Sequence, residues 1–302
     1  MQCVTSTSLA EYPLLSRGKV RDIYETGPDS LLIVTTDRIS AFDVIMDDPI
    51  PLKGVVLNQI TLFWMEKFAH LAPNHLLATE VKDFPKPLQA HADLLEGRSV
   101  LVRRAKPLAI ECIVRGYITG SGWKDYQKTG QVSGHTLPQG LRESDKLAQP
   151  LFTPSTKADL GEHDENISVA EAMRITGQDL AAKAQELALG IYSAGRDYAK
   201  GRGIIIADTK FEFGTVKEGG VDQLILIDEV LTPDSSRFWP MSGYAPGRGQ
   251  QSFDKQFLRD WLEAIAFNKR PPAPKIPQEI IDQTRTKYLE AYRLLTGREL
   301  GI

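Results

Sequence analysis

The stretch from Ala207 to Trp239 constrains the fold more than any other part of the sequence. It contains two apolar, alternating runs that are separated by Gly214 and the pair Gly219-Gly220, and this pattern predicts an antiparallel hairpin. Because side chains alternate between the two faces of a strand, we expect Asp208, Lys210 and Glu212 to share one face. Three charged side chains therefore line one surface of the predicted hairpin.

An acidic residue closes the second strand of this hairpin. Asp228 follows the apolar run L-I-L-I, and a buried carboxylate is costly unless a cation or a metal compensates it. Glu212 and Asp228 together suit Mg²⁺, which takes one or two carboxylates and keeps positions for water and phosphate. Lys210 would then contact a phosphate oxygen. The alternative is an ordinary half-solvated hairpin with a surface ladder of lysines and glutamates.

Length and composition limit the class of protein. A chain of 302 residues is long enough for one large domain or for two to three smaller ones. The net charge of -3 gives no basic excess, so we expect no nucleic-acid partner. Cys3 and Cys112 have no metal-ligand spacing, which fits a reducing cytosol. No apolar run approaches the ~20 residues of a membrane span, and the expected location is cytoplasmic.

A second hairpin is predicted over residues 15–43, around the turn at 27–30. The N-terminal part of this hairpin contains a glycine flanked by cationic side chains, in the run Arg17, Gly18, Lys19, Val20 and Arg21. A glycine lets backbone N–H groups approach a phosphate closely, and the flanking cations suit a nucleotide triphosphate. An ordinary solvated turn is the alternative. A dense polar cluster follows the second strand and contains Asp37, Arg38, Ser40 and Asp43.

Helical patterns occur in four other parts of the chain. They cover 55–70, 168–200 with a break near Gly177, 253–267 and 277–296. Ser168 with Glu171 forms a capping-box pattern, and Ser252 is the candidate cap of the third helix. We expect a loop over 84–87 and two strands joined by a connector at Lys106-Pro107, which an adenine ring could contact by analogy with nucleotide-binding hinges.

Two polar segments are candidates for ligand contacts. The glycine-rich segment 115–123 is predicted to be tightly turned, and its Arg115 and Ser121 could clamp an anion. The segment 151–166 is almost wholly polar, which is typical of a functional loop or of a capped, solvated one. His163 beside Asp164 would allow acid–base chemistry under the first alternative.

Six short motifs occur between Ser16 and about Asp260. They read G-K-V-R-D-I-Y, T-D-R-I-S-A-F-D, I-E-C-I-V-R-G-Y-I-T-G-S-G, F-T-P-S-T-K-A-D-L-G-E-H-D-E-N, D-T-K-F-E-F-G and D-E-V-L-T-P-D-S-S-R-F-W. In this order they resemble the motifs of the SAICAR synthetase family, in its longer, single-function form. No motif position departs from the family pattern.

The resemblance implies an ATP- and Mg²⁺-dependent ligase of purine biosynthesis. Such an enzyme condenses carboxyaminoimidazole ribonucleotide (CAIR) with L-aspartate to give SAICAR, ADP and phosphate, through an acyl phosphate. The implied fold is α+β, with a kinase-like antiparallel sheet domain over 1–105, an ATP-grasp-like domain over 106–250 and a helical extension over 251–302. The expected partners are these small molecules, with neither nucleic acid nor membrane, and the expected assembly is a monomer or a small homo-oligomer.

The resemblance also implies roles for residues at the matching positions. Contacts to ATP are implied for Arg17, Gly18, Lys19, Val20, Arg21, Arg103, Ala105, Glu111 and Lys210. Contacts to the other substrates are implied for Asp37, Ser40, Asp43, Arg115, Ser121, Lys157, Asp164, Arg237 and Lys255. Glu212 and Asp228 would hold Mg²⁺. Asp208, Lys210 and Arg115 would be catalytic, with Asp208 as the base for the amine of aspartate.

Two other classes of protein compete with this interpretation. A kinase would share the N-terminal sheet, but the sequence contains no H-R-D-x-x-x-x-N catalytic loop. A non-catalytic nucleotide-binding module would not need Lys210, Glu212 and Asp228 together with the anion clamp. Aspartate-dependent release of ADP separates a ligase from a kinase, and turnover separates it from a binding module.

Overall fold

The structure, a computed structural model, describes residues 3–157, 164–253 and 255–301. The chain forms two compact units, of which the first combines residues 1–63, 75–105 and 253–302. The second combines residues 64–74 and 106–252. In the described part of the chain, every ladder between named strands is antiparallel, and helices accompany the main sheet of each unit. The expected α+β class is therefore confirmed.

The first unit is built on a five-stranded sheet with the order β1-β2-β3-β7-β6. Its strands are β1 (Leu14–Arg17), β2 (Arg21–Gly27), β3 (Ser30–Thr35), β6 (Leu76–Ala78) and β7 (Ser99–Arg103). The predicted hairpin over 15–43 is confirmed, since β2 pairs with β3 in a register that places Tyr24 opposite Leu32. Leu32 is fully buried and packs with Leu88 and Leu95, and burial of one such side chain contributes about 1.5–3 kcal/mol.

Short elements and two C-terminal helices complete the first unit. They are β4 (Ser40–Ala41), β5 (Val44–Ile45), the 3-10 helix η1 (Val81–Asp83), α2 (Lys86–Gln89), α3 (Ala92–Leu95), α7 (Gln256–Ala264) and α8 (Gln278–Thr296). The helix α1 (Lys53–Lys67) begins in this unit, and the boundary between the units follows Phe63. Leu258 of α7 and Ile281 of α8 share a buried cluster with Ile39 and Met46. The C-terminal segment is therefore packed against the N-terminal part of its own unit.

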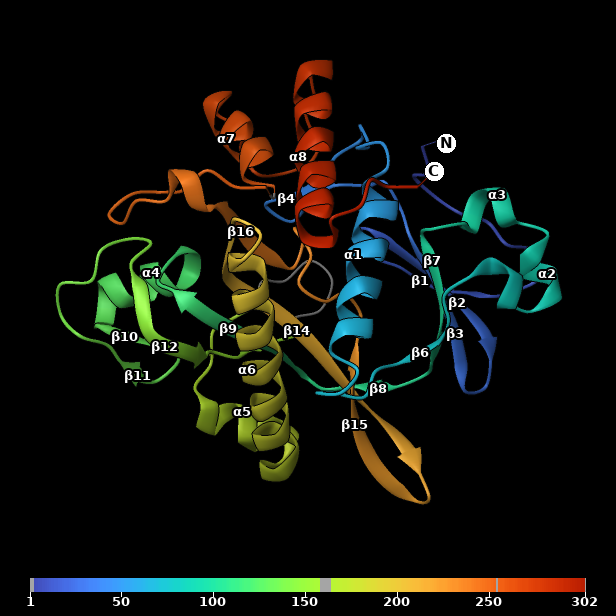
Figure 1. Ribbon diagram of the computed structural model, residues 1–302, viewed down its shortest axis with the longest axis horizontal. Helices are drawn as coiled ribbons and strands as arrows, with labels where there is room; N and C mark the ends of the chain where they lie inside the picture. The colour runs from blue at the N-terminus through green and yellow to red at the C-terminus, as the bar shows by residue number, and fades with distance from the viewer. Residues whose placement is uncertain (1–2, 158–163, 254, 302) are drawn as a thin grey trace. The chain divides into compact units, whose positions relative to one another are not determined.

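The second unit is built on a sheet with the path β12-β9-β14-β15, to which β8, β13 and β16 add short pairings. Its strands are β8 (Lys106–Pro107), β9 (Ile110–Tyr117), β12 (Lys146–Phe152), β13 (Ser155–Thr156), β14 (Ile204–Glu218), β15 (Val221–Ile227) and β16 (Ser236–Pro240), with a separate pair β10 (Gln131–Val132) and β11 (His135–Thr136). Its helices are α4 (Gly120–Thr129), α5 (Val169–Thr176), α6 (Gln178–Lys200) and the 3-10 helix η2 (Met241–Gly243). Figure 1 shows α6 lying across β9 and β14.

The long helix α6 approaches the sheet closely at one point. The hydroxyl of Tyr192 donates a hydrogen bond of 2.7 Å to the carbonyl of Ile206 on β14. A Cβ atom at Gly116 on β9 would lie 2.0 Å from that same hydroxyl. Glycine at this position therefore makes room for the contact that fixes α6 on the sheet.

The hairpin predicted from the segment 207–239 is confirmed, with a longer first strand than the sequence suggested. Strand β14 runs without a break through Gly214, and its register with β15 extends from Glu212 opposite Ile227 to Glu218 opposite Val221. The turn between the strands consists of Gly219 and Gly220, both at positive φ.

Helix predictions were confirmed where local capping decides the boundary. Ser168 accepts a hydrogen bond of 3.1 Å from the backbone N–H of Glu171, α5 ends before Gly177, and α8 ends at Gly297 in a left-handed conformation. Helix α7 was predicted to begin too early. The helix begins at Gln256 and its N-cap position is Lys255, so Ser252 lies before the cap, where its hydroxyl donates to the carbonyl of Phe238.

Three segments predicted as loops contain regular structure. Residues Arg115–Tyr117 extend β9 and Gly120–Trp123 begin α4, so the glycine-rich segment is a strand-to-helix junction. Lys106-Pro107 pairs with β14 instead of forming a free connector. Lys86 opens the one-turn helix α2, where Pro87 is tolerated because it occupies the first turn.

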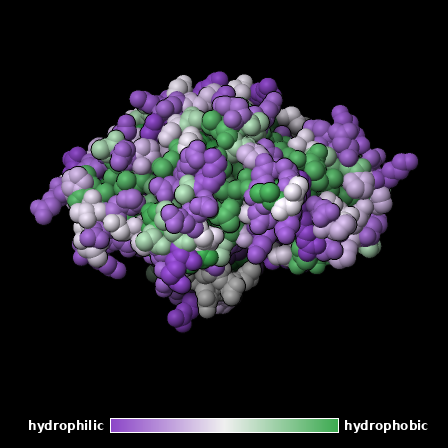
Figure 2. All heavy atoms as spheres, turned by 90° about the horizontal axis from the view of Figure 1, so that it is seen from below, coloured by the Kyte–Doolittle hydropathy of each residue, from purple (hydrophilic) through white to green (hydrophobic). Residues whose placement is uncertain are grey.

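Hydrophilic residues are distributed over the face of the molecule drawn in Figure 2, with smaller hydrophobic areas between them. Among the described helices, none is both long enough and apolar enough to cross a membrane.

Candidate active site

The charged face of β14 is completed by its neighbour β9. The two strands are antiparallel, with Asp208 opposite Arg115 and Lys210 opposite Ile113. Arg115 and Glu111 occupy alternate positions on β9, and they form ion pairs with Asp208 and Lys210 respectively. The predicted sharing of one face by Asp208 and Lys210 is therefore confirmed by their partners.

The first group of charges on this face is the arginine cluster, which we define as Arg115, Arg237 and Asp208. Nη1 of Arg115 donates to Oδ2 of Asp208 at 2.9 Å, and Arg237 forms an ion pair with the same oxygen. Arg115 also donates to the hydroxyls of Ser121 at 2.9 Å and Thr153 at 3.0 Å. Two guanidinium groups thus share one carboxylate, and the excess positive charge suits an anionic ligand.

Burial sets the electrostatics of the arginine cluster. Arg115 is 2% exposed and Asp208 is 5% exposed, whereas the side chain of Arg237 is one-third exposed. Burial lowers the pKa of Arg115, and the adjacent carboxylate of Asp208 opposes that shift. Because Arg115 is held by three partners, it presents a fixed guanidinium, while Arg237 is accessible to a ligand.

A glycine at the start of α4 determines the position of Arg237. Gly120 has a φ of +58°, and a Cβ atom there would lie 2.3 Å from Nη2 of Arg237. Any side chain would displace the guanidinium and strain the backbone. Ser121 follows directly, so the arginine cluster meets the N-terminal end of α4, where backbone N–H groups also favour anions.

The second group is the lysine–carboxylate cluster, which we define as Lys210, Glu111, Asp164, Lys157 and Glu212. Lys210 forms ion pairs with Glu111 and, at 3.1 Å, with Asp164, while Lys157 pairs with Glu212. The cluster therefore holds two cations among three carboxylates on the same strand surface.

Glu111 and Lys210 of this cluster influence each other's pKa. Burial raises the pKa of Glu111, the cation of Lys210 opposes the shift, and the charge of Asp164 adds to it. Burial disfavours the charged form of Lys210, but Glu111 and Asp164 outweigh this effect and raise its pKa. Lys210 is thus held as a cation, as a contact to a phosphate oxygen requires.

The donor set predicted for Mg²⁺ consists of Glu212 and Asp228. Glu212 lies in β14 and is paired with Lys157. Asp228 follows the last residue of β15 and has a φ of +61°, so it leaves the alternation of the strand. Within the described residues, no three His, Cys, Asp or Glu side chains gather into a metal site. Glu212 and Asp228 are both partly exposed, and Mg²⁺ in proteins is commonly bound through one or two carboxylates.

In the first unit, the predicted phosphate loop is an ordered turn. The backbone N–H of Gly18 donates to the carbonyl of Arg21 at 2.8 Å, and Nη2 of Arg38 donates to the carbonyl of Gly18 at 2.9 Å. Arg17 reaches Asp22, and Lys19 forms an ion pair with Asp43. Arg38 belongs to the polar cluster that follows the second predicted strand, where the sequence indicates no role for it. Its hydrogen bond to the carbonyl of Gly18 stabilises this turn.

Asp37 has a different environment from the other predicted substrate contacts. It is fully buried, accepts from the backbone N–H groups of Val4 and Gly54, and lies 3.2 Å from Arg98. Its oxygens therefore anchor the chain of the first unit in the present structure.

The predicted site residues fall in both units. Those in the first unit are Arg17, Gly18, Lys19, Val20, Arg21, Asp37, Ser40, Asp43, Arg103, Ala105 and Lys255. Those in the second are Glu111, Arg115, Ser121, Lys157, Asp164, Asp208, Lys210, Glu212, Asp228 and Arg237. His163, the alternative acid–base residue, lies outside the described residues.

Sequence reasoning missed two hydroxyl groups that support the charged face. Thr153 accepts from Nε of Arg115, and Ser155 donates to Glu111 at 3.2 Å. Both belong to the motif F-T-P-S-T-K, whose polar composition predicts a loop. Only the pairing of β12 and β13 with β9 brings these hydroxyls beside Arg115 and Glu111.

Together the α+β fold and the two charged clusters define an enzyme that acts on anionic small molecules. The family model of SAICAR synthetase matches residues 14–274. The phosphoribosylaminoimidazole-succinocarboxamide synthase of Maridesulfovibrio salexigens is 66% identical over 297 residues, which cover 98% of each chain. The solved SAICAR-synthase from Saccharomyces cerevisiae, complexed with SAICAR, is 50% identical with a TM-score of 0.91, covering 99% of this chain and 100% of that one. This chain belongs to the SAICAR synthetase family.

Proposed function

We propose that this chain activates the carboxylate of CAIR with ATP, as an acyl phosphate, before L-aspartate attacks. The overall reaction, ligation of CAIR with L-aspartate in purine biosynthesis, is the activity of its family. The single observation that supports a site for the ribonucleotide is the arginine cluster, because Arg115 and Arg237 face one carboxylate and Ser121 lies beside them.

Activation is needed because a carboxylate is a poor electrophile. In the first step a carboxylate oxygen of CAIR bonds to the γ-phosphorus of ATP, and the bond from that phosphorus to ADP breaks. In the second step the amine of aspartate bonds to the carbonyl carbon, phosphate leaves with the transferred oxygen, and the amine loses one proton. The products are SAICAR, ADP, phosphate and a proton.

Arg115, Arg237 and Ser121 are proposed to bind the anionic groups of the ribonucleotide. A guanidinium donates two parallel hydrogen bonds to a carboxylate or phosphate, so it orients the ligand as well as attracting it. Arg115 is preorganised by Asp208 and Thr153, and such fixed donors need no reorganisation during the reaction.

Lys210, Glu212 and Asp228 are proposed to serve phosphate and metal. Lys210 would contact a transferring oxygen, and Glu212 and Asp228 would hold Mg²⁺. When bound, Mg²⁺ neutralises charge on the phosphate oxygens. Lys157 pairs with Glu212, and Asp164 pairs with Lys210. Lys157 and Asp164 are therefore proposed to exchange these ion pairs for contacts with the substrate when it binds.

Asp208 is proposed to receive the proton of the amine. Arg115 and Arg237 both contact its Oδ2, so this carboxylate lies beside the two arginines that are proposed to bind the ribonucleotide. The same geometry also makes Asp208 the residue that positions both guanidinium groups, and the two roles differ in their effect on the pH profile.

The remaining roles implied by the family resemblance are proposed for each unit separately. In the first unit they are contacts to ATP by residues 17–21, Arg103 and Ala105, and contacts to the other substrates by Asp37, Ser40, Asp43 and Lys255. In the second unit Glu111 would join Lys210 at ATP. Two predictions about the fold remain: the first sheet is kinase-like and the second ATP-grasp-like, with divisions at residues 105 and 250. Two predictions about the protein in the cell also remain, namely a cytoplasmic location and a monomeric or small oligomeric state.

Release of ADP by the full chain tests the proposal. With ATP, Mg²⁺ and CAIR present, we expect ADP to form rapidly only when L-aspartate is added. Release without aspartate, together with a stable phosphorylated product, would identify a kinase instead. Tight binding of ATP with no turnover in the complete mixture would identify a binding module.

A further inference from the structure

The second unit contains a cavity of about 440 Å³ that shares no lining residue with the arginine cluster or the lysine–carboxylate cluster. Its walls come from β9, β12, β14, the last turns of α6, and the segment that follows β16. Cavities that bind small molecules in proteins commonly have volumes of roughly 300–1,000 Å³. The cavity is therefore large enough for a small organic ligand.

An irregularity in the sheet forms one wall. Lys146 of β12 pairs with Tyr117 of β9, but the next pair is Leu151 with Arg115, so five steps along β12 correspond to two along β9. The four intervening residues have no ladder partner on β9, and Leu147 and Pro150 among them line the cavity.

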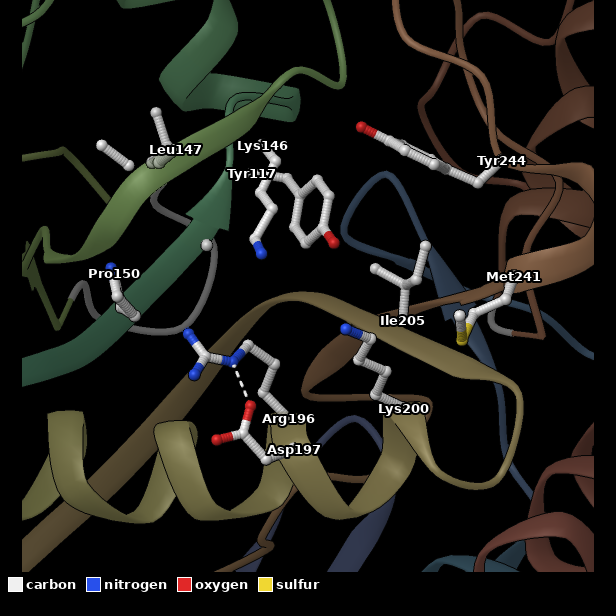
Figure 3. A pocket seen from close by; sticks show the side chains of 12 residues that line it. Tyr117, Lys146, Leu147, Pro150, Arg196, Asp197, Lys200, Ile205, Met241 and Tyr244 are labelled. Carbon is white, nitrogen blue, oxygen red and sulfur yellow. Dashed lines mark hydrogen bonds and ion pairs between the residues drawn. The ribbon is translucent and has the colours of Figure 1, made fainter.

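Three cations from two elements converge on the space. Figure 3 shows the terminal nitrogens of Lys146, from β12, and of Arg196 and Lys200, from α6, directed into the cavity. The one acidic residue in the lining is Asp197, which pairs with Nε of Arg196 at 2.8 Å. The lining thus carries a formal excess of two positive charges.

The dipole of α6 explains only part of this arrangement. Cations are favoured in the last turn of a helix, which accounts for Lys200 on α6 but not for Arg196, which lies one turn earlier. It does not account for Lys146, which reaches the same space from a strand, nor for the hydroxyl of Tyr117, which Figure 3 also shows in the cavity. Burial raises the pKa of Tyr117, so this hydroxyl is a proton donor at neutral pH.

An aromatic and apolar wall lies beside the cations. The rings of Tyr117 and Tyr244 meet edge to face at 5.5 Å, and the Tyr244 hydroxyl is fixed by a 2.9 Å hydrogen bond to the carbonyl of Ser144. Ile205 and Met241 complete this side of the lining. A flat ring suits such a surface, and an anion suits the cations opposite.

We propose that this cavity binds a phosphate monoester that carries a flat ring, as in a nucleoside 5′-monophosphate. Lys146, Arg196 and Lys200 neutralise the phosphate, Tyr117 donates to one of its oxygens, and the ring packs beside Tyr244. Two sources share this chemistry, a purine mononucleotide and an imidazole ribonucleotide. The site is separate from the ligase residues and does not depend on their proposed roles.

Calorimetric titration of the full chain tests the proposal, with ADP and SAICAR first added in excess to fill the ligase site. The probes are inosine 5′-monophosphate, aminoimidazole carboxamide ribonucleotide and inorganic phosphate. We expect at least one of the two ribonucleotides to bind at one further molecule per chain, and phosphate alone to bind much more weakly. Arg196→Gln and Lys200→Gln should each weaken this binding by about tenfold or more, because each removes a charged hydrogen-bond donor.

Lys183→Gln is the matched control, since it removes an exposed cation from α6 that pairs with Glu186 and does not line the cavity. It should leave both the binding and the ligase turnover unchanged. Preference for inosine monophosphate would support the proposal with a purine ligand, and preference for the imidazole compound would support it with a ribonucleotide of the reaction class. No further binding, equal binding of phosphate, or equal weakening by Lys183→Gln would overturn it.

Discussion

Asp208 and Arg115 face each other across β14 and β9, and Oδ2 of Asp208 lies 2.9 Å from Nη1 of Arg115. Both side chains are nearly inaccessible to solvent. A buried guanidinium without its carboxylate is strongly unfavourable, so this pair connects the stability of the second unit with the proposed contact to the ribonucleotide.

Asp208→Asn should impair both properties. The neutral amide leaves Arg115 without a compensating charge, and we expect a loss on the order of 3 kcal/mol in the free energy of unfolding. Displacement of Arg115 and Arg237 should lower kcat/KM by on the order of 100-fold. Denaturant unfolding and initial rates measure the two effects.

The pH dependence of this variant separates the two proposed roles. A base should lose the acidic limb of its rate profile when Asp208 becomes Asn, whereas a positioning residue should leave the shape of the profile and lower its height. Asp222→Asn, an exposed change on β15, should alter neither property. Unchanged turnover and profile in Asp208→Asn would refute both roles.

Gly120→Ala should weaken binding of the ribonucleotide. Its new Cβ would lie 2.3 Å from Arg237 at a φ of +58°, so the guanidinium must move. We expect KM for CAIR to rise about tenfold or more, through loss of a charged contact. Gly130→Ala is the control, because Gly130 is also left-handed, at +70°, but has no neighbour within 4 Å of a Cβ.

Both glycine variants should lose about 1–2 kcal/mol of stability from the left-handed backbone. Only Gly120→Ala should change KM. An equal KM in the two variants would show that the position of Arg237 is not important for substrate binding.

The stability of the first unit should fall as the pH is lowered below neutral. Burial, together with Arg21 and Arg103, lowers the pKa of His75 from 6.5 to about 3. In the unfolded chain His75 therefore binds a proton near pH 6.5, whereas in the folded chain it binds one only near pH 3. Stability present above pH 6.5 is lost progressively between these values, by about 2 kcal/mol at pH 5.

His75→Gln should reduce the difference in unfolding free energy between pH 7 and pH 5. His91→Gln is the control, since His91 is partly exposed and pairs with Glu11 at the surface. If the two variants show the same pH dependence as the parent chain, the account of His75 is wrong.

Glu212→Gln and Asp228→Asn should raise the Mg²⁺ concentration needed for half-maximal rate by about tenfold or more, since each removes a charged metal ligand. Glu218→Gln, which changes a carboxylate at the far end of the same hairpin, should not. If all three variants need the same Mg²⁺ concentration for half-maximal rate as the parent chain, Glu212 and Asp228 do not hold the metal.

Local patterns predicted the elements of this chain well. The alternating pattern over 207–239 predicts the hairpin, and the capping pattern at Ser168 predicts the start of α5. The junction after Arg115 was not predictable in the same way, because its three glycines suggest a turn, whereas the structure continues β9 and begins α4. Packing of Tyr192 on Gly116 and of Arg237 on Gly120 decides that segment, and neither contact is local.

The charged face was partly predictable for a related reason. The two-residue alternation of side chains along a strand places Asp208, Lys210 and Glu212 on one face, but it does not predict which strand pairs with theirs. The pairing of β14 with β9 supplies Arg115 and Glu111, and the return of β16 supplies Arg237. Asp228 shows the limit of the pattern, since the strand ends one residue before it.

An acyl phosphate intermediate requires that one carboxylate oxygen of CAIR ends up in the released phosphate, and isotope labelling measures this transfer. CAIR labelled with oxygen-18 in its carboxylate is incubated with the full chain, ATP, Mg²⁺ and L-aspartate, and the released phosphate is examined by mass spectrometry. We expect one labelled oxygen in each phosphate, because the carboxylate oxygen leaves with the transferred phosphorus. Unlabelled phosphate, formed alongside SAICAR, would contradict it.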